Sequence, residues 1–321
     1  MQYVKLGRTG AKVSRICLGC LTFGNIDEWT IEIDLARLIV RRALDLGINF
    51  FDTADAYSKG RSEEIIGELL KERRDEVIIA TKVYSKMGDG PNERGLSRVH
   101  IYNQVKQSLK RLQTDHIDLY QIHRWDYDTP IEETLKTLTD LVHHEKVRYI
   151  GASSMYAWQF AKALWTSYQL GLERFESMQN QYNLCYREEE REMIPLCRDQ
   201  QIAIIPWSPL AGGFLSGKYK RGTTIDSSRA RHYSQWRERW FKPEDFDVAE
   251  RVEEVAKEKW VTPSQIALAW ILAKNVTAPI IGATKVKHVE EAVEALNINL
   301  SINDIKRLEE PYKLHPIYSQ K

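Results

Sequence analysis

The chain has 321 residues, and its 46 lysines and arginines against 45 aspartates and glutamates give a formal net charge of +1. Because the positive and negative charges nearly cancel, the protein has no general electric field that would attract nucleic acid or an anionic membrane, and we expect neither as a partner. No apolar stretch approaches the roughly 20 residues that span a bilayer, and the N-terminus lacks the apolar core of a signal peptide, which predicts a cytoplasmic protein.

The first predicted elements are a hairpin, a strand and a helix. Residues 2–13 contain Gly7 and Gly10 between short stretches that are too polar for the centre of a sheet, so this hairpin is expected to cap one end of the fold. A buried strand over 16–19 and an amphipathic helix over 34–46 follow it.

Two cysteines of the first strand, Cys17 and Cys20, have the C-x-x-C spacing of redox and metal sites. Positions i and i+3 of a strand face opposite sides, and no second C-x-x-C pair exists to complete a zinc site. Packing in the core is therefore the favoured interpretation.

Short apolar strands and amphipathic helices alternate along the rest of the chain. The expected pairs are strand 48–52 with helix 62–73, 77–81 with 98–112, 117–122 with 131–145, 147–152 with 156–170, 175–179 with 188–200, 202–206 with 247–259 and 263–274, and 278–282 with 286–296. Eight strands and eight helical units favour a closed (β/α)8 TIM barrel, one α/β domain over 1–321. An open sheet would normally carry G-x-G-x-x-G after its first strand, and that motif is absent.

A long connection after the seventh strand, residues 219–246, interrupts this alternation. Connections of this length inside a domain are usually functional or disordered. Its basic residues, Arg229 among them, are candidates for holding an anionic ligand, and its aromatic residues are candidates for a pocket wall: Tyr233, Trp236, Trp240 and Phe241. A solvated insertion is the alternative.

Polar side chains follow the second, third and fourth strands at the points where these strands end. They are Asp52 with Tyr57, Lys82, and His123. In a barrel of parallel strands the chemistry collects past the carboxyl ends, so these four side chains are expected to share one rim. Singly, each has a structural explanation as a half-buried tyrosine, a solvated lysine or a core histidine. Their joint occurrence favours catalysis.

Motifs in a fixed order resemble the aldo-keto reductase superfamily over nearly the whole chain. They are Asp-Thr-Ala-x-x-Tyr from 52, Thr-Lys at 81–82, Asp-Leu-Tyr-x-Ile-His at 118–123, Gly-Ala-Ser-Ser at 151–154, Asn-Gln-Tyr-Asn at 180–183, and Trp-Ser-Pro-Leu-Ala-Gly-Gly from 207. The resemblance implies a (β/α)8 barrel that reduces aldehydes and ketones with NADPH and without a metal.

The resemblance also implies a role for each member of the tetrad. Tyr57 would donate a proton to the developing alkoxide. A free phenol has a pKa of about 10, so a neighbouring cation that favours phenolate is needed, and Lys82 is the candidate. Asp52 would fix that ammonium, while His123 would hydrogen-bond the substrate oxygen and stabilise its charge.

The same resemblance places the nicotinamide at the ends of the fifth to seventh strands. Ser153, Ser154 and Gln181 would hold its carboxamide, although family members often have asparagine or arginine at the second position. Trp207 would stack on the ring, since an aromatic face suits a flat π-system. A tryptophan that only packs the top of the barrel is the alternative.

The stretch after Trp207 would present backbone N–H groups to the pyrophosphate, with Lys218 supplying charge. The residues concerned are Ser208, Pro209, Leu210, Ala211 and Gly212. This stretch also fits most of a P-loop, but Tyr219 stands where a serine or threonine should hold Mg²⁺. A nucleotide triphosphatase is therefore a remote alternative.

The end of the eighth strand resembles the family's adenosine 2′-phosphate site only in part. The matching positions hold Gly282 and Ala283, then His288, then Glu291 and Ala292, and Thr284 and Lys285 between them are further candidates for cofactor contacts. Because a lysine and a helix start still offer positive charge, the resemblance favours NADP as the cofactor. The structural explanation for the lysines is a solvated helix start.

Three aromatic residues near the tetrad predict a substrate pocket for carbonyl compounds with aromatic or apolar bodies: Trp29, Tyr84 and Trp125. The resemblance also allows a second interpretation, a regulatory subunit that binds NADP and is similar to potassium-channel β-subunits, because a fold alone does not determine a function. The sequence predicts neither the physiological carbonyl nor the oligomeric state.

Overall fold

The structure is a computed structural model that describes residues 1–222 and 242–317. The basic and aromatic residues expected to hold a ligand or line a pocket in the long connection lie outside the described residues: Arg229, Tyr233, Trp236, Trp240 and Phe241. Their roles stay predictions.

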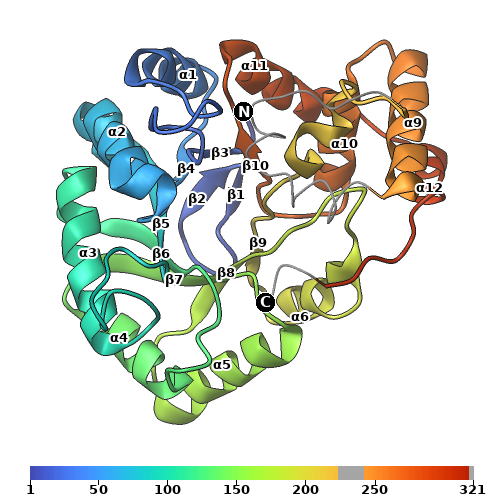
Figure 1. Cartoon of the computed structure of the whole chain (residues 1–321). Coiled ribbons are helices and arrows are strands. Elements are labelled where there is room, and N and C mark those ends of the chain that lie inside the picture. Colours follow the sequence, from blue (N-terminus) through green and yellow to red (C-terminus); the bar gives the residue numbers. More distant parts are fainter. Residues whose placement is uncertain (223–241, 318–321) are drawn as a thin grey trace.

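Eight parallel strands form one sheet in the order β10-β3-β4-β5-β6-β7-β8-β9. Their bounds are β3 (Cys17–Gly19), β4 (Phe50–Asp52), β5 (Ile78–Val83), β6 (Ile117–Ile122), β7 (Val147–Ser153), β8 (Phe175–Gln179), β9 (Ala203–Ile204) and β10 (Ile280–Gly282). Trp207 forms parallel bridges with Gln181 and Ile280, and the Ile280 amide donates to the Pro206 carbonyl at 2.9 Å. These bonds join the two ends of the sheet, and the predicted (β/α)8 barrel is confirmed (Figure 1).

The helices lie outside the sheet, as Figure 1 shows. They are α1 (Ile33–Asp45), α2 (Arg61–Leu70), α3 (Arg98–Leu112), α4 (Ile131–His143), α5 (Ala157–Leu170), α6 (Met193–Asp199), α9 (Pro243–Glu258), α10 (Pro263–Ala273), α11 (Val286–Glu294) and α12 (Ile302–Glu309). None of the helices in the described part of the chain is both long and apolar enough to cross a membrane.

Helix α2 ends at Leu70 rather than at 73, and α9 begins at Pro243 rather than at 247. Two larger differences concern residues 188–200 and the C-terminal end of the fold. The helix expected over 188–200 is a 3-10 turn, η3 (Glu188–Glu190), followed by the short α6. Pro195 explains the late start, since proline lacks an N–H and is tolerated only in the first turn of a helix. The final helix α12 was not predicted, although Ser301 and Asp304 form the capping box with which it begins.

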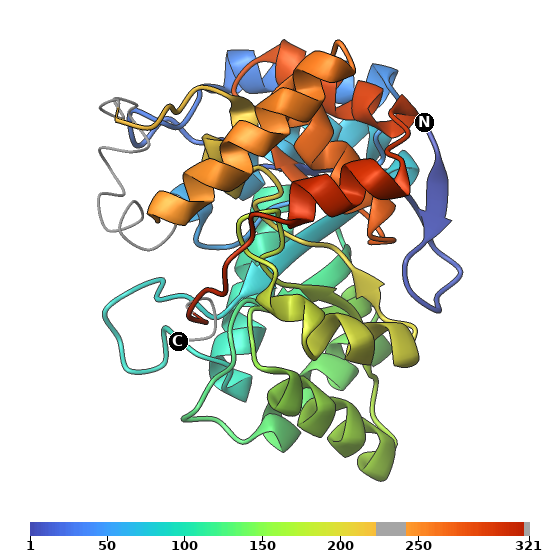
Figure 2. The ribbon, with the colours of Figure 1, turned by 90° about the vertical axis from the view of Figure 1, so that its right-hand side faces the viewer.

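The N-terminal hairpin covers one end of the barrel, as the sequence predicted. Strands β1 (Tyr3–Lys5) and β2 (Lys12–Ser14) pair antiparallel. Leu6 and Val13 are fully buried and pack with Phe50 inside the barrel. Figure 2 shows this hairpin at one side of the molecule, which leaves the opposite end of the barrel for chemistry.

Candidate active site

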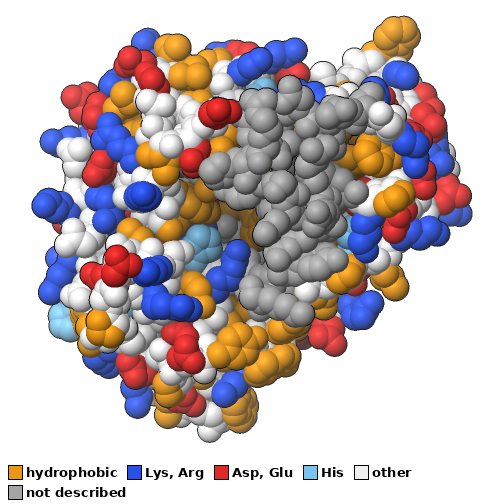
Figure 3. Space-filling view, in the orientation of Figure 1, with side chains coloured by type: hydrophobic (Ala, Val, Ile, Leu, Met, Phe, Trp, Pro, Cys, Tyr) orange, Lys and Arg blue, Asp and Glu red, His pale blue; other side chains and the backbone are white. Residues whose placement is uncertain are grey.

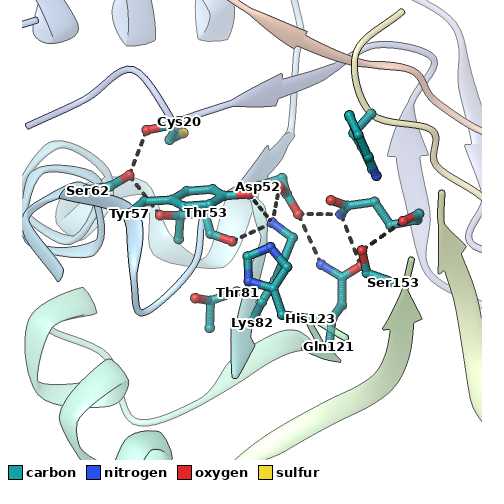
Figure 4. Close-up of polar contacts among 12 residues, drawn as sticks. Cys20, Asp52, Thr53, Tyr57, Ser62, Thr81, Lys82, Gln121, His123 and Ser153 are labelled. Carbon is teal, nitrogen blue, oxygen red and sulfur yellow. Dashed lines mark hydrogen bonds and ion pairs between the residues drawn. The ribbon is translucent and has the colours of Figure 1, made fainter. Parts of the chain in front are cut away.

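Three neighbouring strands bring the predicted tetrad together at the end opposite the hairpin. Asp52 is the last residue of β4, Lys82 lies near the end of β5, and His123 directly follows β6. Tyr57 begins the 3-10 helix η1 (Tyr57–Gly60) in the loop after β4. Figure 3 shows this face hollowed near its centre, with histidine and basic side chains in the hollow. Figure 4 shows the four side chains converging.

The ammonium of Lys82 is the centre of the tetrad. Its Nζ donates to Asp52 Oδ1 at 2.5 Å, to the Thr53 carbonyl at 2.8 Å and to Tyr57 Oη at 3.2 Å. The side chain is fully buried. Burial pushes the pKa of Lys82 down, but the attraction of Asp52 and Tyr57 outweighs burial and raises the pKa above its ordinary value. Lys82 is therefore a fixed cation at neutral pH.

Two glutamines that sequence reasoning missed hold the other oxygen of Asp52. Gln121 Nε2 and Gln179 Nε2 donate to Asp52 Oδ2 at 3.0 and 2.8 Å. Both glutamines are buried, and a buried carboxylate is tolerated where such partners satisfy it. One pattern could have revealed Gln121: it lies two residues before His123, so the alternation of a strand puts both on one face.

Tyr57 carries a neutral phenol beside this cation. Burial raises the pKa of Tyr57, while Lys82 and, more weakly, Arg124 act to lower it. The Tyr57 ring lies edge-on to His123, with ring centroids 5.8 Å apart. The phenol therefore keeps its proton at neutral pH and has a positive charge in place to stabilise the phenolate that its loss would leave.

His123 is a neutral imidazole with an uncommitted nitrogen. Burial, followed by repulsion from Lys82 and Arg124, holds its pKa well below the ordinary histidine value. Its Nδ1 is buried and has no hydrogen-bond partner among the described residues. A buried nitrogen without a partner is costly unless a ligand satisfies it, so His123 is suited to a hydrogen bond with a bound molecule.

Cys17 of β3 and Cys20, which directly follows this strand, lie outside the tetrad. Cys17 and Cys20 are buried free thiols, and burial raises the pKa of both far above the ordinary value. The Cys20 carbonyl accepts from Ser62 Oγ at 2.7 Å, which ties β3 to α2. Within residues 1–222 and 242–317 no group of three or more His, Cys, Asp and Glu side chains is arranged to hold a metal ion.

The residues expected at the nicotinamide lie together beside the tetrad. Trp207 Nε1 donates to Ser154 Oγ at 3.2 Å, and Ser153 Oγ donates to the Gln179 carbonyl at 2.8 Å. Gln181 is 3% exposed, and its Oε1 has no hydrogen-bond partner within the described ranges. An orphaned buried acceptor at this place fits the amide of a nicotinamide carboxamide.

Asn180 is a residue of this group that the sequence did not single out. Its Oδ1 accepts from the Ser154 backbone N–H at 2.8 Å, and its Nδ2 donates to Glu189 at 2.6 Å. Ser154 has a left-handed φ of +51°, which is uncommon for a residue with a side chain. Asn180 therefore holds the backbone conformation that presents the Ser154 hydroxyl.

The stretch expected at the pyrophosphate forms a tight turn with repeated left-handed backbone. Ser208, Ala211 and Gly212 have φ values of +54°, +48° and +68°. Such successive conformations form concavities lined by N–H groups, which suits an anion. Lys218 follows in a turn rather than at the start of a helix, unlike the lysine of a P-loop. This geometry gives no support to the triphosphatase alternative.

The basic residues expected at the adenosine end lie close to one another. Burial lowers the pKa of His288, and the nearby charges of Lys218, Lys285 and Lys287 lower it further. Lys287 pairs with Glu291 at 3.4 Å, whereas Lys218 and Lys285 form no ion pair within the part of the chain that the structure describes. The Thr284 N–H donates to His288 Nδ1 at 3.3 Å, and Gly282 is exposed with open space around its Cα.

The three aromatic residues expected at the substrate are not equally placed. Tyr84 and Tyr57 are both close enough to Arg124 to act on its pKa, which they raise. Trp125 packs against Trp158 of α5, with ring centroids 6.2 Å apart. Trp29 is 9% exposed in the loop between β3 and α1.

A second acidic group near Lys82 has a different environment from Asp52. Asp55 is fully buried, and neither carboxylate oxygen has a hydrogen-bond partner in the described residues. Burial, with repulsion from Glu63, raises the pKa of Asp55 to about 8. Folding therefore keeps a proton on this carboxyl that the unfolded chain would release.

Asparagine at position 55 is expected to stabilise the protein in a pH-dependent manner. A raised carboxyl pKa in the folded state makes stability fall as pH rises from about 4 towards about 8, because only the unfolded state gains charge there. The free energy of unfolding of Asp55→Asn should thus match that of the parent near pH 4 and exceed it at pH 8 by on the order of 5 kcal/mol. Urea denaturation at both pH values measures this, with exposed Asp199→Asn as the control; a gap that does not grow with pH would refute it.

Comparisons with known proteins agree with this geometry. A model of the aldo/keto reductase family matches residues 15–313. Versiconal hemiacetal acetate reductase of Aspergillus parasiticus is 39% identical over 98% of this chain and 99% of its own length. A putative aryl-alcohol dehydrogenase of Saccharomyces cerevisiae is 40% identical over 98% and 97%, and an aldo-keto reductase of Fusarium vanettenii is 41% identical over 99% and 92%.

These relatives are named as reductases and dehydrogenases, which does not favour the regulatory-subunit alternative. The family match covers the barrel from its first strand to beyond α12 and includes every member of the tetrad. The chain therefore belongs to the aldo/keto reductase family, and it is an oxidoreductase of the kind that reduces carbonyl compounds with a nicotinamide cofactor.

Proposed function

We propose that this chain reduces aldehydes and ketones to alcohols with NADPH, with Tyr57 as the proton donor. The observation that supports this most is the position of Lys82, which donates to both Asp52 and Tyr57 from a fully buried site. A phenol in contact with a fixed cation is an acid whose conjugate base is stabilised, and carbonyl reduction requires such an acid.

Each residue of the tetrad has one task in this proposal. His123 binds the substrate oxygen by a hydrogen bond and so sets the carbonyl near the Tyr57 hydroxyl. Tyr57 gives its proton to that oxygen as negative charge develops on it, while Lys82 stabilises the phenolate left behind. Asp52 positions Lys82. The bound nicotinamide cofactor supplies the hydride.

The cofactor would lie across the ends of the later strands. Ser153, Ser154 and Gln181 would hold the nicotinamide carboxamide, and Trp207 would contact its ring. The orphaned Gln181 oxygen is the observation that supports this placement. The turn over 208–213 would hold the pyrophosphate, since its left-handed residues are grouped as an anion site requires.

The proposed activity is tested by NADPH consumption against a panel of aldehydes and ketones. We expect steady turnover and a higher kcat/KM for benzaldehyde than for glycolaldehyde, because the aromatic residues near the tetrad reward buried apolar area. Absence of turnover with a bound cofactor would support the regulatory-subunit alternative. A preference for glycolaldehyde would contradict the aromatic pocket while leaving the reaction in place.

Selectivity for NADPH over NADH is proposed to depend on Lys285. This lysine is exposed and unpaired among the described residues, next to Lys218 and His288. A partly exposed contact with the doubly charged 2′-phosphate contributes on the order of 1 kcal/mol, or roughly fivefold in affinity. Lys285→Ala should therefore lower the ratio of NADH to NADPH dissociation constants by about that factor.

Fluorescence titration of both cofactors measures this ratio. Lys306→Ala is the matched control, because Lys306 is an exposed helix residue without an ion pair in the described residues and lies on α12, outside the cofactor residues. Equal dissociation constants for NADPH and NADH in the parent protein would refute the assignment of NADP.

A further inference from the structure

Arg124 is a charged residue at the tetrad that the proposed reaction leaves without a task. It directly follows His123, and its only hydrogen bond within the described residues runs from Nη1 to the His123 carbonyl at 2.9 Å. It is half-buried, and burial lowers the pKa of its guanidinium. Tyr57 and Tyr84 are the nearby groups that act to raise that pKa.

No carboxylate pairs with Arg124 in the described part of the chain. Among the other shielded arginines, Arg74 pairs with Asp118 at 2.7 Å and Arg111 with Glu63 at 2.6 Å, whereas Arg15 and Arg174 donate to backbone carbonyls. Arg124 differs from all four because it directly follows His123 of the tetrad. Removing a guanidinium from water without a counter-ion costs free energy, and such uncompensated charges gather at functional sites.

The charges around the tetrad leave a net positive site. Asp52 balances Lys82, His123 is neutral because its pKa is held low, and Arg124 adds one further positive charge. The planar fork of a guanidinium matches the two oxygens of a carboxylate, with hydrogen bonds that are charge-assisted. A negatively charged group on the substrate would both satisfy the free donors and balance the charge.

We propose that Arg124 is the anchor for a carboxylate on the substrate, so that the preferred substrates are aromatic aldehydes or ketones that carry a carboxylate on the same molecule. Tyr84 is near enough to the guanidinium to act on its pKa, and its ring offers aromatic surface for the body of such a substrate. This inference rests on the proposed carbonyl reduction and names the class of carbonyl that it serves.

Turnover of matched acids and esters tests the proposal. The three isomeric carboxybenzaldehydes are compared with their uncharged methyl esters, using the full chain and NADPH. We expect at least one acid to exceed its ester in kcat/KM by about 10-fold or more, the effect of one charge-assisted contact. In Arg124→Gln that ratio should fall to near one, and in Arg124→Lys, which keeps the charge but not the fork, it should be intermediate.

Binding of benzoate to the protein saturated with NADP⁺, measured by calorimetry, gives a readout that does not depend on turnover. Arg124→Gln should weaken benzoate about 10-fold or more, and should leave the NADP⁺ dissociation constant within a few-fold. Arg98→Gln is the matched control, because Arg98 is exposed on α3 and pairs with Asp140. The Arg98 variant should change neither the ratio nor benzoate binding.

Each failure has its own signature. If no acid exceeds its ester in the parent and benzoate binds the parent and Arg124→Gln equally, the anchor is refuted while carbonyl reduction stands. If Arg124→Gln lowers the turnover of acids and esters equally, the anchor is also refuted, and Arg124 instead acts on Tyr57. If Arg124→Gln strongly weakens NADP⁺ binding, the anchor is refuted because Arg124 then contributes to the cofactor site. If the parent reduces no carbonyl at all, the proposed function fails, whatever benzoate shows.

Discussion

Replacing Tyr57 with phenylalanine is expected to lower kcat for aldehyde reduction by at least about 100-fold, because general acid catalysis is typically worth 10²- to 10⁴-fold. This corresponds to roughly 3 to 5.5 kcal/mol of barrier. Phenylalanine keeps the ring that packs edge-on to His123 but removes the hydroxyl that Lys82 contacts. The affinity for NADPH should stay within a few-fold of the parent, since the expected cofactor residues lie on other strands.

Single-turnover kinetics and a fluorescence titration of NADPH separate the two effects. Tyr102→Phe is the matched control, since Tyr102 lies on α3 beside Asp140 and takes no part in the tetrad. A Tyr57→Phe protein that reduces aldehydes at nearly the parent rate would show that Tyr57 is not the acid. If a lower NADPH affinity accounts for the whole loss of activity, the substitution acts on cofactor binding rather than on proton transfer.

Asp52→Asn is expected to destabilise the fold by about 3 to 5 kcal/mol, because it leaves a buried ammonium without its counter-charge. The Lys82 side chain is 0% exposed and that of Asp52 is 3% exposed, so water cannot replace the lost partner. Asparagine keeps the size of the side chain, and the loss is therefore one of charge rather than of packing. Denaturation in guanidinium chloride at pH 7 measures the change in free energy of unfolding.

The pH dependence of this change has a definite sign. A lysine whose pKa is raised by folding contributes stability that is complete below its ordinary pKa of 10.5 and is lost as pH rises through the folded value. The gap between parent and Asp52→Asn should thus persist from neutral pH to about pH 10 and narrow above it. Asp140→Asn is the control, because the exposed pair of Arg98 with Asp140 contributes about 0 to 1 kcal/mol. If Asp52→Asn and Asp140→Asn lower the free energy of unfolding by similar amounts, burial does not make the pair of Lys82 with Asp52 more costly to break.

The tetrad could be predicted from the sequence because of where strands end. An apolar run that stops at Asp52, Lys82 or His123 indicates both a buried strand and the point where its carboxyl end meets the barrel rim. The partners of Asp52 were not predictable in the same way. Gln121 is indicated only by its position two residues before His123. Gln179 ends β8 as Asp52 ends β4, but a neutral amide at a strand end does not by itself indicate a partner for a carboxylate.

Arg124 and α6 show two further limits of the sequence. An arginine after a strand is usually solvated, so only the contacts of the folded chain reveal that Arg124 is half-buried and lacks an acidic partner among the described residues. The apolar periodicity of 188–200 predicts one helix, but Pro195 must lie in the first turn of a helix, so α6 begins only at Met193. The boundary of a helix depends on single residues, whereas the order of strands and helices depends on many residues and is therefore easier to predict.

The seam between β9 and β10 gives Trp207 a second role. The Trp207 to Ile280 bridge, a few backbone bonds near it and one bond from the Ile204 N–H to Thr277 Oγ1 at 3.0 Å join these two short strands in the described residues. Segments with so few bonds open locally at a lower free energy than the rest of a fold. A molecule that binds only the closed form stabilises it by mass action, by about 2.7 kcal/mol at 100 times its dissociation constant. If the cofactor contacts Trp207 as proposed, local opening of the seam and release of the cofactor are coupled equilibria, and a substitution at Trp207 would change both at once.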